Sequence, residues 1–342
     1  MIFPPKPVPG DRVAVVSPSG GLSELFPAPY ELGLERLRSF GLEPVEYPTT
    51  GKLDTTPAER AADLHAAWSD PSIRAVVASI GGDDQLTVLK HLDPEVFRSD
   101  PKPFFGYSDN TNLLNFLYSV GIAAFHGGSV MVQFGRGGAM HPDSERSLRA
   151  ALFESGDFEL TPATGWTDRD RDWTDASSLE TEPELFPGTG WQWHGPAEPV
   201  TGRLWGGCLE ILEWQLAANR WMLPTDQYSG VLFLETTEEL PTAAEVHRIV
   251  RNLGERGLLE RFDAVLWARP KAWSLDNRRS TEDCAAYVAD QYATARATIA
   301  QYNPDALVVT GLDIGHTDPQ QVLPYGGTVR LDPAARRITV TY

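Results

Sequence analysis

The sequence has little cysteine, no long hydrophobic run and a shortage of positive charge. Cys208 and Cys284 are the only two cysteines in 342 residues, which is too few for a disulfide framework and gives no C-x-x-C metal-ligand spacing. No segment stays apolar for the ~20 residues that a membrane span needs. The N-terminus also lacks a charged stretch followed by an apolar one, as a secretory signal would have. These absences predict a soluble, cytoplasmic protein with reduced thiols.

The charge is strongly one-sided, since 47 acidic residues face 29 Lys and Arg residues and the net charge is -18. A body this acidic is repelled by phosphate backbones and by anionic lipid, so we expect neither nucleic acid nor membranes as partners. A small anionic substrate still fits if its site is locally positive. The length suits two domains of ~100–200 residues, and the apolar share of 42% is typical of globular proteins.

The first half alternates apolar runs with amphipathic stretches, which predicts an α/β domain over residues 1–155 with a parallel sheet of the flavodoxin or Rossmann kind. The segment Thr56-Pro57-Ala58-Glu59 has the capping-box pattern that begins a helix. The predicted strands are 12–16, 74–80, 103–107 and 122–125, and the predicted helices are 30–40, 57–68 and 109–120.

Residues 156–199 are charged, rich in Pro and Gly and weakly periodic, and they carry several tryptophans. We interpret them as the interdomain connection with a long ordered loop. The alternation resumes in residues 200–342 and predicts a C-terminal mixed α/β domain. Its predicted strands are 230–234, 263–268 and 306–310, its predicted helices are 243–253 and 280–302, and an antiparallel hairpin of 328–331 and 337–340 closes the chain.

Three polar residues each follow a predicted buried strand: Ser108, Glu235 and His316. Sites in α/β sheets form at the carboxyl ends of strands, where rigid ends meet open loops. A serine hydroxyl becomes a good nucleophile only beside a base, and that base needs a third group to orient it and to stabilise its positive charge. Serine, histidine and a carboxylate at three strand ends would supply these roles.

The surroundings of Ser108 allow two interpretations. A strand, then Gly106-Tyr107-Ser108, then a helix resembles the nucleophile elbow of serine hydrolases, although the second glycine of the Gly-x-Ser-x-Gly pattern is absent. Alternatively, Ser108 or Asp109 only caps the helix, which is a common role for both residue types.

An oxyanion hole needs backbone N–H groups directed at the developing charge. The candidates are the amide of Asp109 and the amides of Gly82 and Asp83, because glycine in the turn allows a close backbone approach. This turn also fits a simple connection between strand and helix, or a phosphate-binding loop, although no Lys or Arg lies near it in the sequence.

The other candidates keep alternatives as well. Glu235 precedes a predicted helix, where acidic residues favour the helix dipole, and His316 fits a packed or solvated histidine. His126 follows another predicted strand and is a competing base. Trp191 and Trp193 either form an aromatic wall for a substrate ring or anchor their loop.

The motifs taken together, in their order along the chain, resemble the LD-carboxypeptidase family of serine peptidases. The resemblance implies a Ser-Glu-His triad between two domains, with Ser108 as nucleophile, His316 as general base and Glu235 as its orienting carboxylate. It implies no metal or cofactor, and it suggests a homodimer. The motifs are Ser17-Pro18-Ser19, Gly81-Gly82, Gly106-Tyr107-Ser108-Asp109, His126-Gly127, Gly206-Gly207, Leu234-Glu235 and Gly315-His316.

Two branches of this family differ in substrate. One trims murein tetrapeptides, and the other, the microcin C self-immunity branch, hydrolyses the amide between an aminoacyl group and a nucleotide phosphoramide. The segments 202–210 and 234–238 look more like the second branch, and 81–84 departs from the murein type. We therefore expect a peptidyl- or aminoacyl-nucleotide substrate, with a murein tetrapeptide as the alternative. A two-lobed binding protein without catalysis is the alternative from another class.

Overall fold

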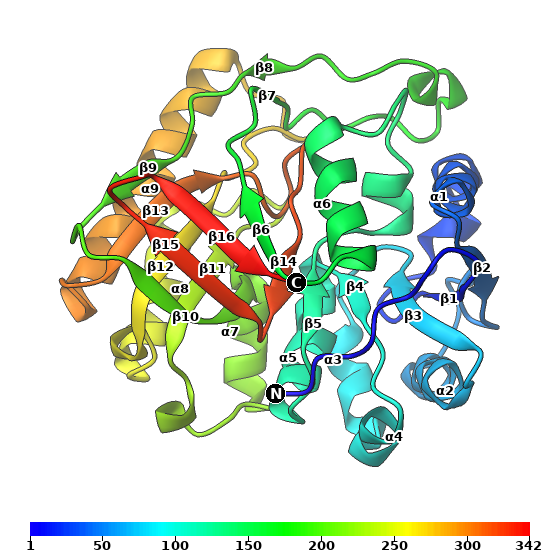
Figure 1. Cartoon of the computed structure of the whole chain (residues 1–342). Coiled ribbons are helices and arrows are strands. Elements are labelled where there is room, and N and C mark those ends of the chain that lie inside the picture. Colours follow the sequence, from blue (N-terminus) through cyan, green and yellow to red (C-terminus); the bar gives the residue numbers. More distant parts are fainter.

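Two β-sheets organise the chain, and helices pack against both of them (Figure 1). The computed structural model describes residues 1–175 and 177–342. The first sheet has six strands in the order β14-β5-β4-β3-β1-β2, and the second has eight in the order β6-β16-β15-β10-β11-β12-β13-β9. A separate pair, β7 (Gly165–Trp166) and β8 (Phe186–Pro187), lies outside both sheets. The predicted α/β class is confirmed.

The first sheet is parallel except for β14, which pairs with β5 in the antiparallel direction. Its central strands are continuous apolar runs because helices cover both faces of the sheet. The strands are β1 (Arg12–Val16), β2 (Glu43–Glu46), β3 (Ile73–Ala78), β4 (Phe104–Gly106), β5 (Ala124–His126) and β14 (Leu323–Tyr325).

The helices of this half follow the strands in the predicted alternation. The capping box before α2 is confirmed, since the Thr56 side chain accepts from the Glu59 backbone N–H and the Glu59 carboxylate accepts from the Thr56 backbone N–H. The helices are α1 (Pro27–Ser39), α2 (Pro57–Ser69), α3 (Gln85–Val88), α4 (Pro94–Ser99), α5 (Thr111–Ser119) and α6 (Pro142–Phe153).

The second sheet has a parallel centre, formed by β10 to β13, with antiparallel strands at both sides. The predicted closing hairpin is confirmed as β15 paired with β16. The strands are β6 (Asp157–Leu160), β9 (Gln192–His194), β10 (Val200–Cys208), β11 (Gly230–Glu235), β12 (Phe262–Ala268), β13 (Leu307–Leu312), β15 (Thr328–Asp332) and β16 (Arg337–Thr341). The helices are α7 (Leu209–Ala218), α8 (Ala243–Glu255) and α9 (Thr281–Tyr302).

The segment 156–199 is more ordered than its composition indicates, because it supplies both edge strands of the second sheet, β6 and β9. These strands have four and three residues, too few for a period-2 pattern to be visible. In the opposite direction, β14 from the C-terminal part completes the N-terminal sheet. The domain boundaries at 155 and 199 remain a prediction.

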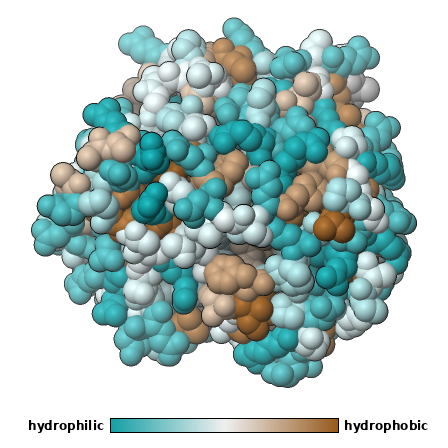
Figure 2. Space-filling view, in the orientation of Figure 1, coloured by the Kyte–Doolittle hydropathy of each residue, from teal (hydrophilic) through white to brown (hydrophobic). Residues whose placement is uncertain are grey.

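The two halves are joined by buried hydrogen bonds as well as by apolar packing. The Trp205 indole donates to Asn115 Oδ1 at 3.0 Å, and the Tyr325 hydroxyl donates to the Gly206 carbonyl at 2.9 Å. The outer face in Figure 2 is mostly hydrophilic, with apolar residues in small separate groups. No helix in the described part of the chain has the length and apolar character to cross a bilayer. These buried contacts fix the two halves of the chain relative to each other, and the candidate site contains residues from both.

Candidate active site

Ser108 lies in a strained turn between β4 and α5. Its φ is +60°, a left-handed conformation that costs a residue with a Cβ about 1–3 kcal/mol and is concentrated at functional sites. The side chain does not cap the helix that follows, which rules against the capping interpretation for Ser108. No hydrogen bond of the Ser108 hydroxyl occurs among the residues that the structure describes. The turn therefore holds a hydroxyl that has no structural hydrogen bond.

Buried hydrogen bonds from uncharged donors hold this turn in place. The Asp109 carboxylate accepts from the Gln85 backbone N–H at 2.9 Å and from the Asn112 amide at 2.7 Å. Burial raises the pKa of Asp109 to about 7, because its ionised form is poorly solvated. The Asn110 amide donates to the carbonyls of Ile80 and Tyr107, both at 3.1 Å. These contacts fix the backbone on both sides of Ser108.

Gly81 is the glycine that approaches Ser108. A Cβ added to Gly81 would lie 3.0 Å from both Cβ and Oγ of Ser108 and 3.5 Å from the Asp109 backbone nitrogen. Gly82 has a φ of +154° and packs instead against Ser19, while Asp83 is exposed. In the described part of the chain, the backbone N–H groups of Gly81, Gly82 and Asp83 donate no hydrogen bond. The turn thus has three N–H groups without a hydrogen-bond partner, and Gly81 is the residue of the turn that lies beside the serine.

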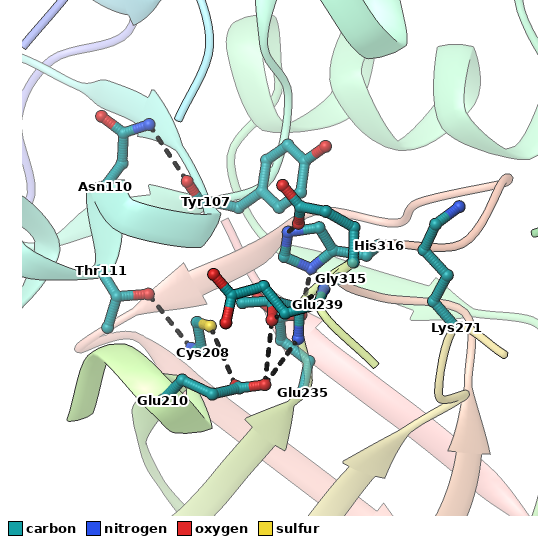
Figure 3. Close-up of polar contacts among 12 residues, drawn as sticks. Tyr107, Asn110, Thr111, Cys208, Glu210, Glu235, Glu239, Lys271, Gly315 and His316 are labelled. Carbon is teal, nitrogen blue, oxygen red and sulfur yellow. Dashed lines mark hydrogen bonds and ion pairs between the residues drawn. The ribbon is translucent and has the colours of Figure 1, made fainter. Parts of the chain in front are cut away.

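Glu235 and His316 form a buried ion pair at the ends of β11 and β13. The His316 Nδ1–H donates to Glu235 Oε2 at 2.6 Å, and Glu235 is 1% exposed (Figure 3). Burial opposes ionisation of Glu235, but the charge of His316 outweighs it and lowers the Glu235 pKa. Gly315, with a φ of +80°, is required here, because a Cβ would lie 2.6 Å from Glu235 Oε2. The predicted pairing of this acid with this histidine is present in the structure.

His126 lies on the other side of Glu235 but is not hydrogen-bonded to it. Its Nε2 is 3.7 Å from Glu235 Oε1, and its ring is fully buried between Tyr107 and Phe233. Gln320 links the loops of the two histidines: it donates to the Gly315 carbonyl at 2.6 Å and accepts from the Gly128 backbone N–H at 2.8 Å. His126 is therefore buried in the core next to Glu235 and does not line the cavity.

His316 has a second carboxylate partner, which the sequence did not single out. Its Nε2 lies 3.0 Å from Glu238 Oε2, while its ring faces Tyr107 edge-on at 5.1 Å. Burial alone would lower the His316 pKa, but the charges of Glu235 and Glu238 raise it well above its usual value. The charge of His316 in turn lowers the pKa of the Glu238 carboxylate to about 2. The two carboxylates therefore favour the positively charged form of the ring.

A cavity of about 500 Å³ opens beside His316 and is lined by both halves of the chain. Trp173 lines it and contacts Phe26 edge-to-face at 5.6 Å. Neither Trp191 nor Trp193 is among its lining residues. The Trp191 indole is buried and donates to Asp313 Oδ2 at 2.9 Å, and Trp193 packs against the core from β9.

The cavity also contains charged residues that the motifs did not reveal. Lys271 donates to the Asp168 carbonyl at 2.6 Å and to Asp170 Oδ1 at 2.7 Å, and Arg136 donates to Asp318 Oδ2 at 2.8 Å. These residues come from loops far apart in the sequence, where spacing gives no signal. Within the described residues, no group of three His, Cys, Asp or Glu side chains is placed to hold a metal ion.

Comparisons with known proteins agree with this architecture. Two family models match, described as the LD-carboxypeptidase N-terminal domain over residues 13–127 and the LD-carboxypeptidase C-terminal domain over residues 201–331. The Microcin C7 self-immunity protein MccF of Escherichia coli is 25% identical over 97% of this chain and 93% of its own. A Bacillus subtilis protein named "Probable murein peptide carboxypeptidase" is 24% identical over 97% and 92% of the two chains.

The fold likeness extends over the whole chain. The structure of MccF in the wild-type apo state superposes with a TM-score of 0.86, at 24% identity, and covers 100% of this chain and 99% of that one. The structure of MccF with glutamyl sulfamoyl guanosine gives a TM-score of 0.84 over 99% and 98% of the two chains. On the family matches and this shared fold, the chain belongs to the LD-carboxypeptidase family and is a serine peptidase.

Proposed function

We propose that Ser108, His316 and Glu235 form the catalytic triad of this peptidase. The observation that carries the proposal is the 2.6 Å contact between His316 Nδ1 and the buried Glu235 carboxylate. This contact fixes the ring tautomer and stabilises its positive charge, which is the work of the third member of a triad. Tyr107, the neighbour of Ser108, packs against the His316 ring and so holds the serine turn beside the base.

Each step of amide hydrolysis can then be assigned to a residue of the site. His316 Nε2 takes the proton from Ser108 Oγ as the oxygen attacks the carbonyl carbon, and it later gives that proton to the leaving nitrogen. A water molecule then attacks the acyl-enzyme, with His316 again as the base, and releases the acid and free Ser108. The oxyanion is stabilised by the free N–H groups of the 81–83 turn and by that of Asp109, because fixed donors beside the nucleophile need no reorganisation.

For the substrate, we propose the amide bond of a peptidyl- or aminoacyl-nucleotide of microcin C type. The likeness to MccF supports this, since solved structures of that protein hold glutamyl sulfamoyl guanosine and aspartyl sulfamoyl adenosine. Trp173 is the aromatic residue suited to stack on a base, because it lines the cavity beside His316. The positions of Trp191 and Trp193 do not support an aromatic wall for the substrate and fit the alternative, in which they anchor their loop.

A murein tetrapeptide is the second candidate, favoured by the name of the Bacillus subtilis relative. Incubation with processed microcin C and with murein tetrapeptide, followed by mass spectrometry, separates the two. We expect cleavage of the microcin amide by the wild type and none by Ser108→Ala. Cleavage of the tetrapeptide alone would assign the chain to murein recycling. Cleavage of neither would contradict both substrate assignments.

A further inference from the structure

In this structure, His316 cannot act as a base, because Glu238 occupies the nitrogen that a base would use. The ring lies between Glu235 on Nδ1 and Glu238 on Nε2, at 2.6 and 3.0 Å. The Glu235 contact is a charge-assisted hydrogen bond and the Glu238 contact is an ion pair, and the two carboxylates together favour the doubly protonated ring. For proton transfer from Ser108, Nε2 must lose its proton and its contact with Glu238. A step of the catalytic cycle must therefore move the Glu238 carboxylate away from Nε2.

We propose that Glu238 is the binding site for a positively charged group on the acyl part of the substrate, namely its α-ammonium, and that binding this group withdraws Glu238 from His316. The inference rests on the triad proposed above and deepens it, because it names a substrate feature and a specificity residue. The ammonium takes over Glu238 as its partner, and the proton on Nε2 is released to water. His316 is then neutral and free to face Ser108.

The position of Glu238 fits the geometry of an aminoacyl amide. The ammonium nitrogen is separated from the carbonyl carbon by the α-carbon only, which places the two atoms roughly 2.5 Å apart. The carbonyl carbon must lie beside Ser108 Oγ, itself within ~3 Å of His316 Nε2 during attack. The ammonium therefore arrives within a few ångströms of Nε2, and the Glu238 carboxylate is 3.0 Å from the same atom.

The charges around the cavity favour a cation over a carboxylate in this place. Lys271 is paired with Asp170 at 2.7 Å and Arg136 with Asp318 at 2.8 Å, so a substrate carboxylate would compete with a carboxylate that is already bound to each. The remaining cations are engaged too: Arg169 lies 3.7 Å from Asp168, and Arg171 donates to the carbonyls of Ser178 and Thr181.

Glu238, by contrast, forms no ion pair with Lys or Arg within the described residues, and His316 is its only cationic partner. Once His316 becomes neutral, the carboxylate has no ion-pair partner among the described residues. Glu239 is the adjacent residue, and its pKa is raised by burial and by the negative charges of Asp83 and Glu238. This part of the site thus attracts a cation as soon as His316 gives up its proton.

The two carboxylates on His316 also differ in freedom to move. Glu235 has a side chain that is 0% exposed at the end of β11, whereas the Glu238 side chain is 60% exposed on the loop that follows. Glu238 can therefore turn away without opening the core. Glu235 cannot, and it keeps the ring oriented while Nε2 is released. The same histidine has a permanent partner and an exchangeable one.

Calorimetric titration with two ligands that differ only in the amine tests the inference. Alanyl sulfamoyl adenosine carries the ammonium, and propionyl sulfamoyl adenosine lacks it without added bulk. We expect the wild type to bind the alanyl compound at least tenfold more tightly at pH 7.5. In Glu238→Gln the ratio should fall towards one. In Glu239→Gln, which removes the same charge from an adjacent exposed position, the ratio should persist.

A second measurement keeps this inference separate from the triad. The rate of fluorophosphonate labelling requires neutral His316, so it should rise with pH through the raised His316 pKa. Glu238→Gln removes one of the two carboxylates, and its midpoint should lie at lower pH than in the wild type. The facing groups Glu235, His126 and Tyr107 are unchanged.

If both variants label at Ser108 but the ligand ratio and the midpoint do not change in Glu238→Gln, the inference is wrong and the triad stands. An equal loss of the ratio in Glu239→Gln would also overturn it, because the effect would then be general charge. If wild type and Ser108→Ala label alike, the triad itself fails.

Discussion

The contacts around Ser108 have uncharged donors and come from residues 80–112, whereas those around His316 are ionic and join segments about 80 residues apart. Asn110 and Asn112 reach carbonyl or carboxylate groups three residues away, and the strain of the turn resides in the backbone of Ser108 itself. His316 meets Glu235 across 81 residues of sequence. The serine is held by its own turn and the neighbouring segment 80–85, and the histidine by the acidic residues at and after the end of β11.

The serine turn is therefore rigid, whereas one of the contacts of the histidine can change. The serine turn is buried and hydrogen bonds from Gln85 and Asn110 fix its backbone, so it presents the hydroxyl in one position. The histidine ring is held on one side by Glu235 and on the other by the exposed Glu238. We infer that the N-terminal half fixes the nucleophile and the C-terminal half controls when its base is available.

The largest effect is expected at the base. His316→Ala should slow fluorophosphonate labelling by several orders of magnitude, about 10⁴–10⁶ by analogy with other triads, with the fold retained. His126→Ala is the matched control, since His126 is as buried but is 3.7 Å from the other oxygen of Glu235. It should lower the melting temperature more than the labelling rate. The opposite order would make His126 the base.

A smaller effect is expected at the two glycines that contact the site, one in each half. Gly315→Ala places a Cβ 2.6 Å from Glu235 Oε2, so it should displace the carboxylate and slow labelling about 10²-fold. Gly121→Ala is its control, because Gly121 has a similar φ of +88° but no atom within 4 Å of an added Cβ. Gly81→Ala should cost less, since a Cβ there is 3.0 Å from Ser108 and a small shift relieves it.

If Gly315→Ala, Gly121→Ala and Gly81→Ala all slow labelling to the same extent, the proposed difference between the two halves of the site is wrong. Equal loss of labelling in Gly121→Ala and Gly315→Ala would show that backbone strain, and not the Glu235 contact, is responsible. Melting temperatures measured in parallel separate the two causes, because strain alone should destabilise both proteins without slowing the remaining folded enzyme.

The same difference explains what the sequence could predict. Local patterns predicted most of the central strands, five of the helices and the turn at Ser108, and the capping box at Thr56 is confirmed. The strands β2, β10 and β14 and the helices α3, α4, α6 and α7 were not predicted. Glu238 and Lys271 gave no signal, because their roles depend on loops that only the fold brings together. The edge strands β6 and β9 were too short to show a period, and Trp191 and Trp193 pack in their neighbourhood instead of lining the cavity.

The central claim is that Ser108 is the nucleophile, and peptide mapping after fluorophosphonate labelling tests it most directly. We predict one adduct, on the peptide that contains Ser108, and no adduct in Ser108→Ala with an unchanged melting temperature. Equal labelling of both proteins, or an adduct on another residue, would contradict the assignment.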